Sequence, residues 1–253
     1  MAQLEAMPAR EGDEHMVAQV HLQAMENNEL LHAQFPCKEA LDFLRQWLEK
    51  DTLEHIHSKE KGVLVTKDTE TSEIASFVKW VVHRNVSDEQ PDEDEEWPSF
   101  CRSQYLDSYA DITANVRKLV MGTEPYYRES APFVSCPWAN IVTSLDMYSS
   151  RSWHLQTDTV LDVTFLCTNP RHGRKGAASG LLRQVQRLAA EDGIAVVLES
   201  TMNAVTFYQK LGFQVMRSLD MMLPPRGSSD PTELYEERCM VWKAAADGKN
   251  LDA

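Results

Sequence analysis

The sequence predicts an α/β fold, and three observations lead to that class. The chain has 253 residues, 43% of them apolar and 25% charged, which suits one globular domain. Short β-branched runs alternate along it with segments whose apolar residues repeat every three or four positions. After residue 161 the expected order is strand, loop, helix, strand, helix and strand, which is typical of layered α/β folds.

The charge balance narrows the classes of partner. The chain carries 25 Lys and Arg against 39 Asp and Glu, a formal net charge of -14. Phosphate backbones attract the opposite charge, so we expect no nucleic-acid partner. No window approaches the ~18 consecutive apolar residues of a membrane span, and residues 1–16 lack the apolar stretch of a signal peptide. We therefore expect no membrane partner and a cytoplasmic location, with a nuclear one left open.

Cysteine and histidine usage predicts neither a metal site nor disulfides. The five cysteines are odd in number and far apart. They are Cys37, Cys101, Cys136, Cys167 and Cys239. No C-x-x-C pair occurs and the eight histidines are scattered, so no zinc site or disulfide framework is indicated. We expect free thiols in a reducing compartment.

The N-terminal part is expected to contain a flexible end and two helices. Residues 1–13 are polar and are predicted to be flexible. From Glu14 to His32 the apolar residues fall at helical spacing, and the Phe35-Pro36 step ends the pattern. A second helix follows. Its apolar stripe consists of Leu41, Leu44, Trp47 and Leu48.

The middle of the chain is expected to form a hairpin, an acidic loop and a helix. Residues 62–66 and 74–82 are β-branched and aromatic, which predicts an antiparallel pair of strands. The segment 85–98 is rich in acids, which predicts a solvated loop, with an acidic docking site as the alternative. A helix is expected at 104–121. Residues 128–159 show no clear period and are left unassigned.

The C-terminal part alternates strands and helices. Residues 163–167 are expected to form a buried strand, followed by a cationic turn at 171–175 and a helix that Gly193 ends. The apolar face of this helix consists of Ala178, Leu181, Leu182, Val185, Leu188 and Ala189. The remaining expected elements are a buried strand at 194–198, a helix at 204–211, and strands at 214–222 and 237–242.

The turn before that helix carries the most informative pattern. Five of the ten glycines lie between residues 173 and 212, and residues 163–190 contain five cations and no acid. Glycines before a helix N-terminus expose main-chain N–H groups that bind anions together with the helix dipole, so a small phosphorylated ligand is predicted. The segment has neither G-x-G-x-x-G spacing nor a G-K-[ST] ending. Alternatively, the glycines only permit tight packing and the cations only face solvent.

Two motifs resemble those of one enzyme superfamily. The segment from Thr168 to Ala178 is similar to a pyrophosphate loop of the form Q/R-x-x-G-x-G/A, and Ala204 to Phe213 matches A-[IV]-x-F-Y-x-x-x-G-F. In this order and spacing the chain resembles the GNAT superfamily of acyl-CoA-dependent N-acetyltransferases, its fungal-type members in particular. The resemblance implies a mixed, mostly antiparallel sheet flanked by helices. The implied organisation is a flexible end at 1–13, a single domain at 14–243 with an acidic loop at 85–98 and an insertion at 128–160, and a flexible tail at 244–253.

The resemblance also implies which residues bind the co-substrate, acetyl-CoA. The N–H groups from Arg174 to Ser179 are expected to hold the pyrophosphate, and the preceding strand to pair with the pantetheine arm. The implied cofactor-binding residues are Leu166, Cys167, Thr168, Arg171, Gly173, Arg174, Lys175, Gly176, Ala177, Ala178, Ser179 and Thr201. Tyr208 is the implied general acid for the leaving thiolate. Glu199 is a candidate base, although such a residue more often caps a helix or binds solvent.

We therefore expect an N-acetyltransferase that moves an acyl group directly from the thioester of acetyl-CoA to a primary amine of a small molecule. One alternative is a degenerate member of the same fold that binds CoA, or nothing, and regulates or interacts. Gly173, which stands where the family usually has Gln or Arg, and the insertion both suggest it. Acetylation of histones or protein termini is a further alternative. The oligomeric state is not predicted.

Overall fold

The computed structural model describes residues 4–84, 97–121 and 159–244. These residues form a seven-stranded sheet in the order β1-β2-β3-β4-β5-β7-β6. The strands are β1 Leu4–Pro8, β2 Lys61–Asp68, β3 Ile74–Arg84, β4 Thr159–Thr168, β5 Ala195–Thr201, β6 Gln214–Leu223 and β7 Glu233–Trp242. Only the β4–β5 pair among them is parallel. The mixed, mostly antiparallel sheet flanked by helices that the resemblance implies is therefore confirmed.

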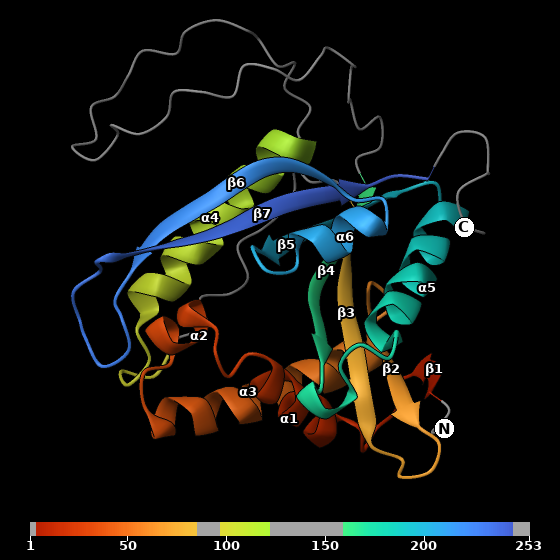
Figure 1. Ribbon diagram of the computed structural model, residues 1–253, viewed down its shortest axis with the longest axis horizontal. Helices are drawn as coiled ribbons and strands as arrows, with labels where there is room; N and C mark the ends of the chain where they lie inside the picture. The colour runs from red at the N-terminus through yellow and green to blue at the C-terminus, as the bar shows by residue number, and fades with distance from the viewer. Residues whose placement is uncertain (1–3, 85–96, 122–158, 245–253) are drawn as a thin grey trace, which may run out of the picture.

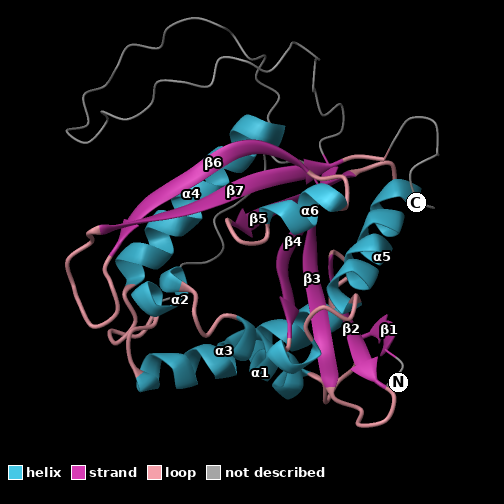
Figure 2. Cartoon of the chain, viewed as in Figure 1, coloured by secondary structure: helices cyan, strands magenta, loops and turns pink. Residues whose placement is uncertain are grey.

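Helices cover both faces of this sheet. They are α1 Glu14–Ala24, α2 Glu29–Gln34, α3 Lys38–His57, α4 Ser103–Met121, α5 Ala177–Glu191 and α6 Val205–Lys210. In Figures 1 and 2, β6 and β7 run across the view and β3 and β4 run down it, so the sheet is strongly twisted. The helices α5 and α6 pack on one face, and α1, α3 and α4 pack on the other.

The side chains of β5 alternate between the two faces of the sheet, so this strand contacts the helices on both sides. Val196 and Leu198 pack with α5 and α6, whereas Ala195 and Val197 pack with residues of α4. Successive side chains of a strand point to opposite faces, so Glu199 belongs to the α4 face. The strand is apolar on both faces because helices bury both.

The strands β4 and β5 pair over only part of their length. Their register runs from Val160 opposite Ala195 to Val163 opposite Leu198, and beyond it each strand continues without the other. A bulge lies at the same level, because Trp80 of β3 faces two residues of β4. A bulge bends its strand and adds twist, which accounts for the separation of β4 from β5. The two strands thus form a fork that opens at their carboxyl ends.

The N-terminal prediction is wrong at two points. Residues 1–13 were expected to be flexible, but Leu4–Pro8 forms the edge strand β1. Five residues are too few to show a periodic pattern, and the pairing with β2 is what orders them. The helix expected from Glu14 to His32 is two helices. The first ends at Ala24, and the Asn28 side chain accepts a hydrogen bond from the Leu31 N–H as the N-cap of α2.

The other elements occur where the sequence predicts them, within a few residues at each end. The hairpin of β2 and β3, the helix α4 and the alternation from β4 to β7 are confirmed. The four cysteines in the described ranges are free. None of the helices in those ranges is long and apolar enough to cross a membrane. The acidic loop, the insertion, the C-terminal tail and Cys136 lie wholly or mostly outside the described residues.

Candidate functional site

The cationic turn between β4 and α5 leaves main-chain donors open. Gly176 precedes α5 with φ of 82°, a left-handed conformation that glycine adopts without strain. The Gly180 N–H donates to the Gly176 carbonyl at 2.9 Å. The N–H groups of Ala177 to Ser179 in the first turn of α5 therefore have no acceptor within the helix. Together with the helix dipole they form an anion-binding end.

A cavity of about 530 Å³ lies against this helix end. It is lined by Leu166, Thr168, His172, Gly173, Arg174, Lys175, Gly176, Ala177, Ala178, Ser179, Ala204, Phe207 and Tyr208. Nine of these residues were predicted to bind acetyl-CoA, and Tyr208 was predicted to be the acid. The cavity therefore joins the two sequence motifs in one place.

Three predicted cofactor-binding residues lie outside the cavity wall. The Cys167 side chain points to the opposite face and packs in the core with α1. Burial raises its pKa to about 12, so it stays a neutral thiol. Arg171 is exposed, and the Thr201 hydroxyl is within 2.7 Å of Asn203 Oδ1. Beyond the fork, the main chain of Leu166 to Thr168 has no strand partner on its β5 side in the described part of the chain.

His172 is a wall residue that sequence reasoning missed. Its side chain is buried, with Nδ1 3.4 Å from Lys175 Nζ and Nε2 3.6 Å from Glu73 Oε2. Its position beside Gly173 in the cationic turn was the available signal. The side chain thus lies between Lys175 of the turn and Glu73, which precedes β3.

Tyr208 is a buried phenol at the cavity wall. Its ring packs edge-on against Phe207 and Phe213, with centroid separations of 5.1 and 5.7 Å. Burial, together with Cys167 and Glu237, raises the pKa of Tyr208 well above its ordinary value. The phenol is therefore protonated at neutral pH and can donate a proton.

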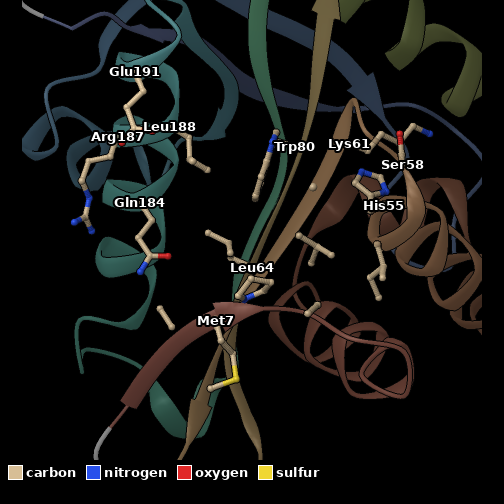
Figure 3. Close-up of a pocket in the computed structure, with 16 residues that line it drawn as sticks. Met7, His55, Ser58, Lys61, Leu64, Trp80, Gln184, Arg187, Leu188 and Glu191 are labelled. Atoms are coloured by element: carbon tan, nitrogen blue, oxygen red, sulfur yellow. The ribbon is translucent and has the colours of Figure 1, made fainter.

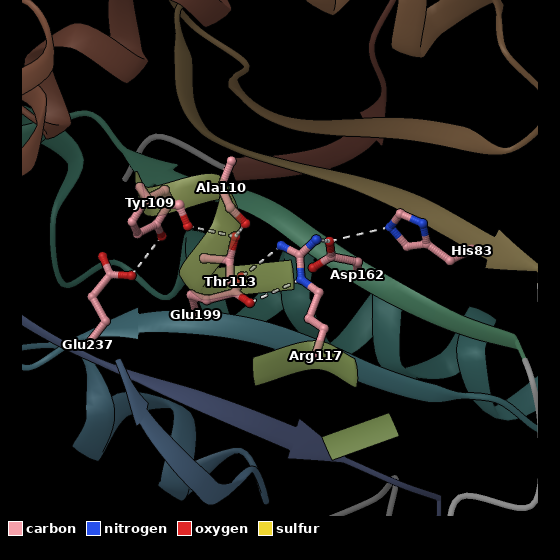
Figure 4. A network of polar contacts seen from close by, with 8 residues as sticks. All are labelled: His83, Tyr109, Ala110, Thr113, Arg117, Asp162, Glu199 and Glu237. Carbon is pink, nitrogen blue, oxygen red and sulfur yellow. Dashed lines mark hydrogen bonds and ion pairs between the residues drawn. The ribbon is translucent and has the colours of Figure 1, made fainter. Parts of the chain in front are cut away.

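Glu199 lies on the α4 face, at the first position of β5 beyond the fork (Figure 4). Arg117 of α4 binds its carboxylate through two contacts, Nε to Oε1 at 3.1 Å and Nη2 to Oε2 at 3.2 Å. Arg117 also reaches Asp162 of β4, with Nη1 3.1 Å from Oδ2. Burial and Asp162 raise the pKa of Glu199 to about 6, against the lowering effect of Arg117. Among the described residues Glu199 caps no helix, and the raised pKa of its carboxyl group lies closer to neutral pH than that of an ordinary glutamate.

A second carboxylate, Glu237 of β7, belongs to the same face. It accepts hydrogen bonds from the hydroxyls of Tyr109 at 2.7 Å and Tyr235 at 2.6 Å. Burial raises the pKa of Glu237. Asn28 donates to the Tyr235 hydroxyl at 3.2 Å and so ties the α1–α2 turn to β7. No motif in the sequence marks Glu237, since only the fold brings α4 over β7.

A larger cavity, of about 600 Å³, lies at the opposite end of α5 (Figure 3). Met7, Leu64, Trp80 and Leu188 give it a mostly apolar lining. It contains none of the predicted site residues. Throughout the described ranges, the cavity included, no group of three or more His, Cys, Asp or Glu side chains is placed to hold a metal ion.

Comparison with known proteins identifies the fold. A family model described as an acetyltransferase (GNAT) domain matches residues 151–220. Mosquito arylalkylamine N-acetyltransferase like 5b aligns with a TM-score of 0.59 at 11% identity, over 95% of this chain and 100% of its own. A structure from Corynebacterium glutamicum, named as histone acetyltransferase HPA2 and related acetyltransferase, aligns with a TM-score of 0.52 at 18% identity, over 97% and 98%.

A GNAT-family acetyltransferase from Streptococcus pneumoniae aligns with a TM-score of 0.50 at 15% identity, over 95% of this chain and 99% of its own. No curated protein sequence matches the chain. At these identities the structural likeness concerns the fold. The chain therefore has the fold of the GNAT acetyltransferases, and its residues 151–220 match the family model of that domain.

Proposed function

We propose that the protein is an acetyl-CoA-dependent N-acetyltransferase that transfers the acyl group directly to a primary amine of a small molecule. One observation carries the proposal. The open N-terminus of α5, the unpaired edge of β4 and the Tyr208 phenol border the same cavity, which lies beside the fork.

The cavity suits the parts of the coenzyme. The N–H groups from Arg174 to Ser179 and the side chains of Arg174 and Lys175 supply positive potential for the pyrophosphate. The main-chain edge of Leu166 to Thr168 can pair with the amide groups of the pantetheine arm as an added strand would. In this placement the thioester reaches the fork.

The reaction needs one proton acceptor and one proton donor. The acceptor amine attacks the thioester carbonyl as the neutral free base, and its nitrogen passes one proton to Glu199 as the amide bond forms. The carbon–sulfur bond breaks, and the thiolate takes the proton of Tyr208. In this proposal a β4 main-chain N–H at the fork binds the carbonyl oxygen, a contact that typically lowers such a barrier by ~3 kcal/mol.

The small-molecule acceptor is supported by the name of one similar fold, an arylalkylamine N-acetyltransferase from mosquito. The acidic surface, with a net charge of -14, favours a cationic acceptor. The fungal-type kinship and the cytoplasmic location remain predictions.

A second candidate function is a CoA-binding protein without turnover. Two observations favour it. The Glu199 carboxylate is already bound by Arg117 through two hydrogen bonds, and Gly173 stands where the family usually has Gln or Arg. Such a protein binds acetyl-CoA but releases no CoA in the presence of amines.

Calorimetric titration with acetyl-CoA and a thiol-release assay over a panel of amines test the two candidates. Binding with thiol release supports the enzyme, and binding without it supports the second candidate. A protein that binds no acetyl-CoA contradicts both. Ligand at ~100 times its dissociation constant should also stabilise the fold by ~2.7 kcal/mol in a thermal melt.

A further inference from the structure

One guanidinium lies between two carboxylates at the fork (Figure 4). Arg117 binds Glu199 through two nitrogens at 3.1 and 3.2 Å, and it reaches Asp162 through the third at 3.1 Å. The three groups come from α4, β5 and β4, so only the folded chain brings them together. Asp162 lies within the stretch where β4 and β5 are paired, and Glu199 is the first residue of β5 beyond that stretch.

The three side chains are largely shielded from water. The side chain of Asp162 is 1% exposed, that of Glu199 is 8% and that of Arg117 is 20%. Neither oxygen of Asp162 has a hydrogen bond within the described residues, and its ionic contacts there are Arg117 and His83, whose Nε2 lies 3.5 Å away. Two carboxylates therefore compete for one buried positive charge. A buried charge is unfavourable unless it is paired, so the balance among the three decides where a proton resides.

We propose that Arg117 and Asp162 are positioning residues for Glu199. Arg117 holds the Glu199 carboxylate at the fork in its ionised form, and Asp162 competes for the same guanidinium and so makes Glu199 a stronger base. The inference rests on the proposed function for its catalytic consequence. The competition of Asp162 and Glu199 for Arg117 can be measured whether or not the protein turns over a substrate.

Other titratable groups surround Glu199, and none of them is changed in the variants used below. Tyr109 of α4 and Cys239 of β7 both have raised pKa values, chiefly through burial, so they are neutral near pH 7. Glu237 of β7 accepts hydrogen bonds from two phenols and also raises the pKa of Glu199, but it is the same in the wild type and in every variant used below. His83 of β3 lies beside Asp162 rather than Glu199. Arg117 is thus the cation that faces Glu199 within the described residues.

The two neighbours act on Glu199 with opposite signs, which gives the test its direction. Asp162→Asn removes a negative charge at nearly constant shape, so Glu199 should lose its proton at lower pH. Arg117→Met removes the positive charge, so Glu199 should keep its proton to higher pH. Each shift should be about one pH unit, the size typical of a close charge. Arg117→Lys keeps the charge but cannot make both contacts, and should fall between wild type and Arg117→Met.

The experiment follows Glu199 in two ways. The first is NMR titration of side-chain carboxyl carbons in glutamate-labelled protein, with the Glu199 signal assigned by Glu199→Gln. The second is the pH profile of kcat/KM with an amine that the wild type accepts, in which the acidic limb should move down for Asp162→Asn and up for Arg117→Met. Arg45→Met is the matched control, since Arg45 is exposed and pairs only with Asp42 of its own helix among the described residues. It should move neither readout.

Opposite shifts support the proposal, and shifts of the same sign or none overturn it. If Arg117→Met does not fold, Asp162→Asn and Arg117→Lys still decide the signs. If the wild type proves inactive, the proposed function fails while the NMR titration still tests the balance. If acetyl-CoA binding and turnover are normal but the titration of Glu199 is unchanged in the variants, only the present inference fails.

Discussion

Tyr208 and Glu199 lie on opposite faces of the central sheet, near the point where β4 and β5 part. Tyr208 packs on the α5 face and borders the cavity at the helix end. Glu199 points to the α4 face and is held by Arg117. A thioester reaching the fork from one face and an amine reaching it from the other would meet between an acid and a base. The parting of two strands after four residue pairs creates this geometry.

Tyr208→Phe tests the acid. The variant should lower kcat by about 100-fold or more, since general acid catalysis typically contributes that much, and should leave the affinity for acetyl-CoA unchanged. Steady-state kinetics and calorimetry measure the two effects. Tyr105→Phe is the matched control, because Tyr105 is a buried phenol at the α2–α4 contact and lines no part of the cavity. An unchanged kcat in Tyr208→Phe would remove Tyr208 from the mechanism.

Gly176→Ala tests the helix end. A Cβ at this position meets no atom within 4 Å, so space is not the constraint, but the φ of 82° is strained for alanine by about 1–2 kcal/mol. We expect a loss of stability of that size and a weaker affinity for acetyl-CoA. The control is Gly180→Ala, which also meets open space but lies at ordinary helical φ, and should stabilise α5 by up to ~1 kcal/mol. Equal affinities in the two variants would show that the turn is not the pyrophosphate site.

Glu199 should give the protein a specific pH dependence. Its pKa is raised in the folded state from 4.5 to about 6. A raised carboxyl pKa means that the folded protein holds the proton more tightly, so this contribution is present below pH 4.5 and is lost as pH rises through 6. Glu199→Gln should therefore gain stability relative to wild type between pH 4.5 and 7, by roughly 2 kcal/mol at most. Urea denaturation at both pH values measures the change, and a difference that is the same at both contradicts it.

Asp51→Asn tests a buried ion pair away from the site. Lys79 of β3 has a fully buried side chain, and its Nζ lies 2.8 Å from Asp51 Oδ2 on α3. Removing the carboxylate leaves a buried ammonium without its counter-ion, which should cost about 3–5 kcal/mol. The double variant Asp51→Asn, Lys79→Met should recover much of the loss. Urea denaturation of both variants checks this, and equal losses would mean that the pair is not what stabilises the contact.

The local order of elements was predictable because it depends on local patterns. The apolar face of α5 and the β-branched run of β4 place those elements from sequence alone. Gly176 and the cations beside it likewise predict an anion site from the sequence, because a left-handed turn before a helix is a local property. The edge strand β1 was missed, because its order comes from pairing with β2 across more than fifty residues.

The sequence by itself determined the α/β order of the elements and the cationic, glycine-containing turn before α5. The roles of that turn in anion binding and of Tyr208 as an acid are predictions from the sequence and its resemblance to a family. The tertiary structure alone decided that Arg117 bridges Asp162 and Glu199. It also decided that the Glu237 carboxylate accepts hydrogen bonds from one tyrosine of α4 and one of β7. Those contacts join residues far apart in the chain. The basicity of a buried carboxylate depends on which charges the fold brings beside it, and no local pattern encodes that distance.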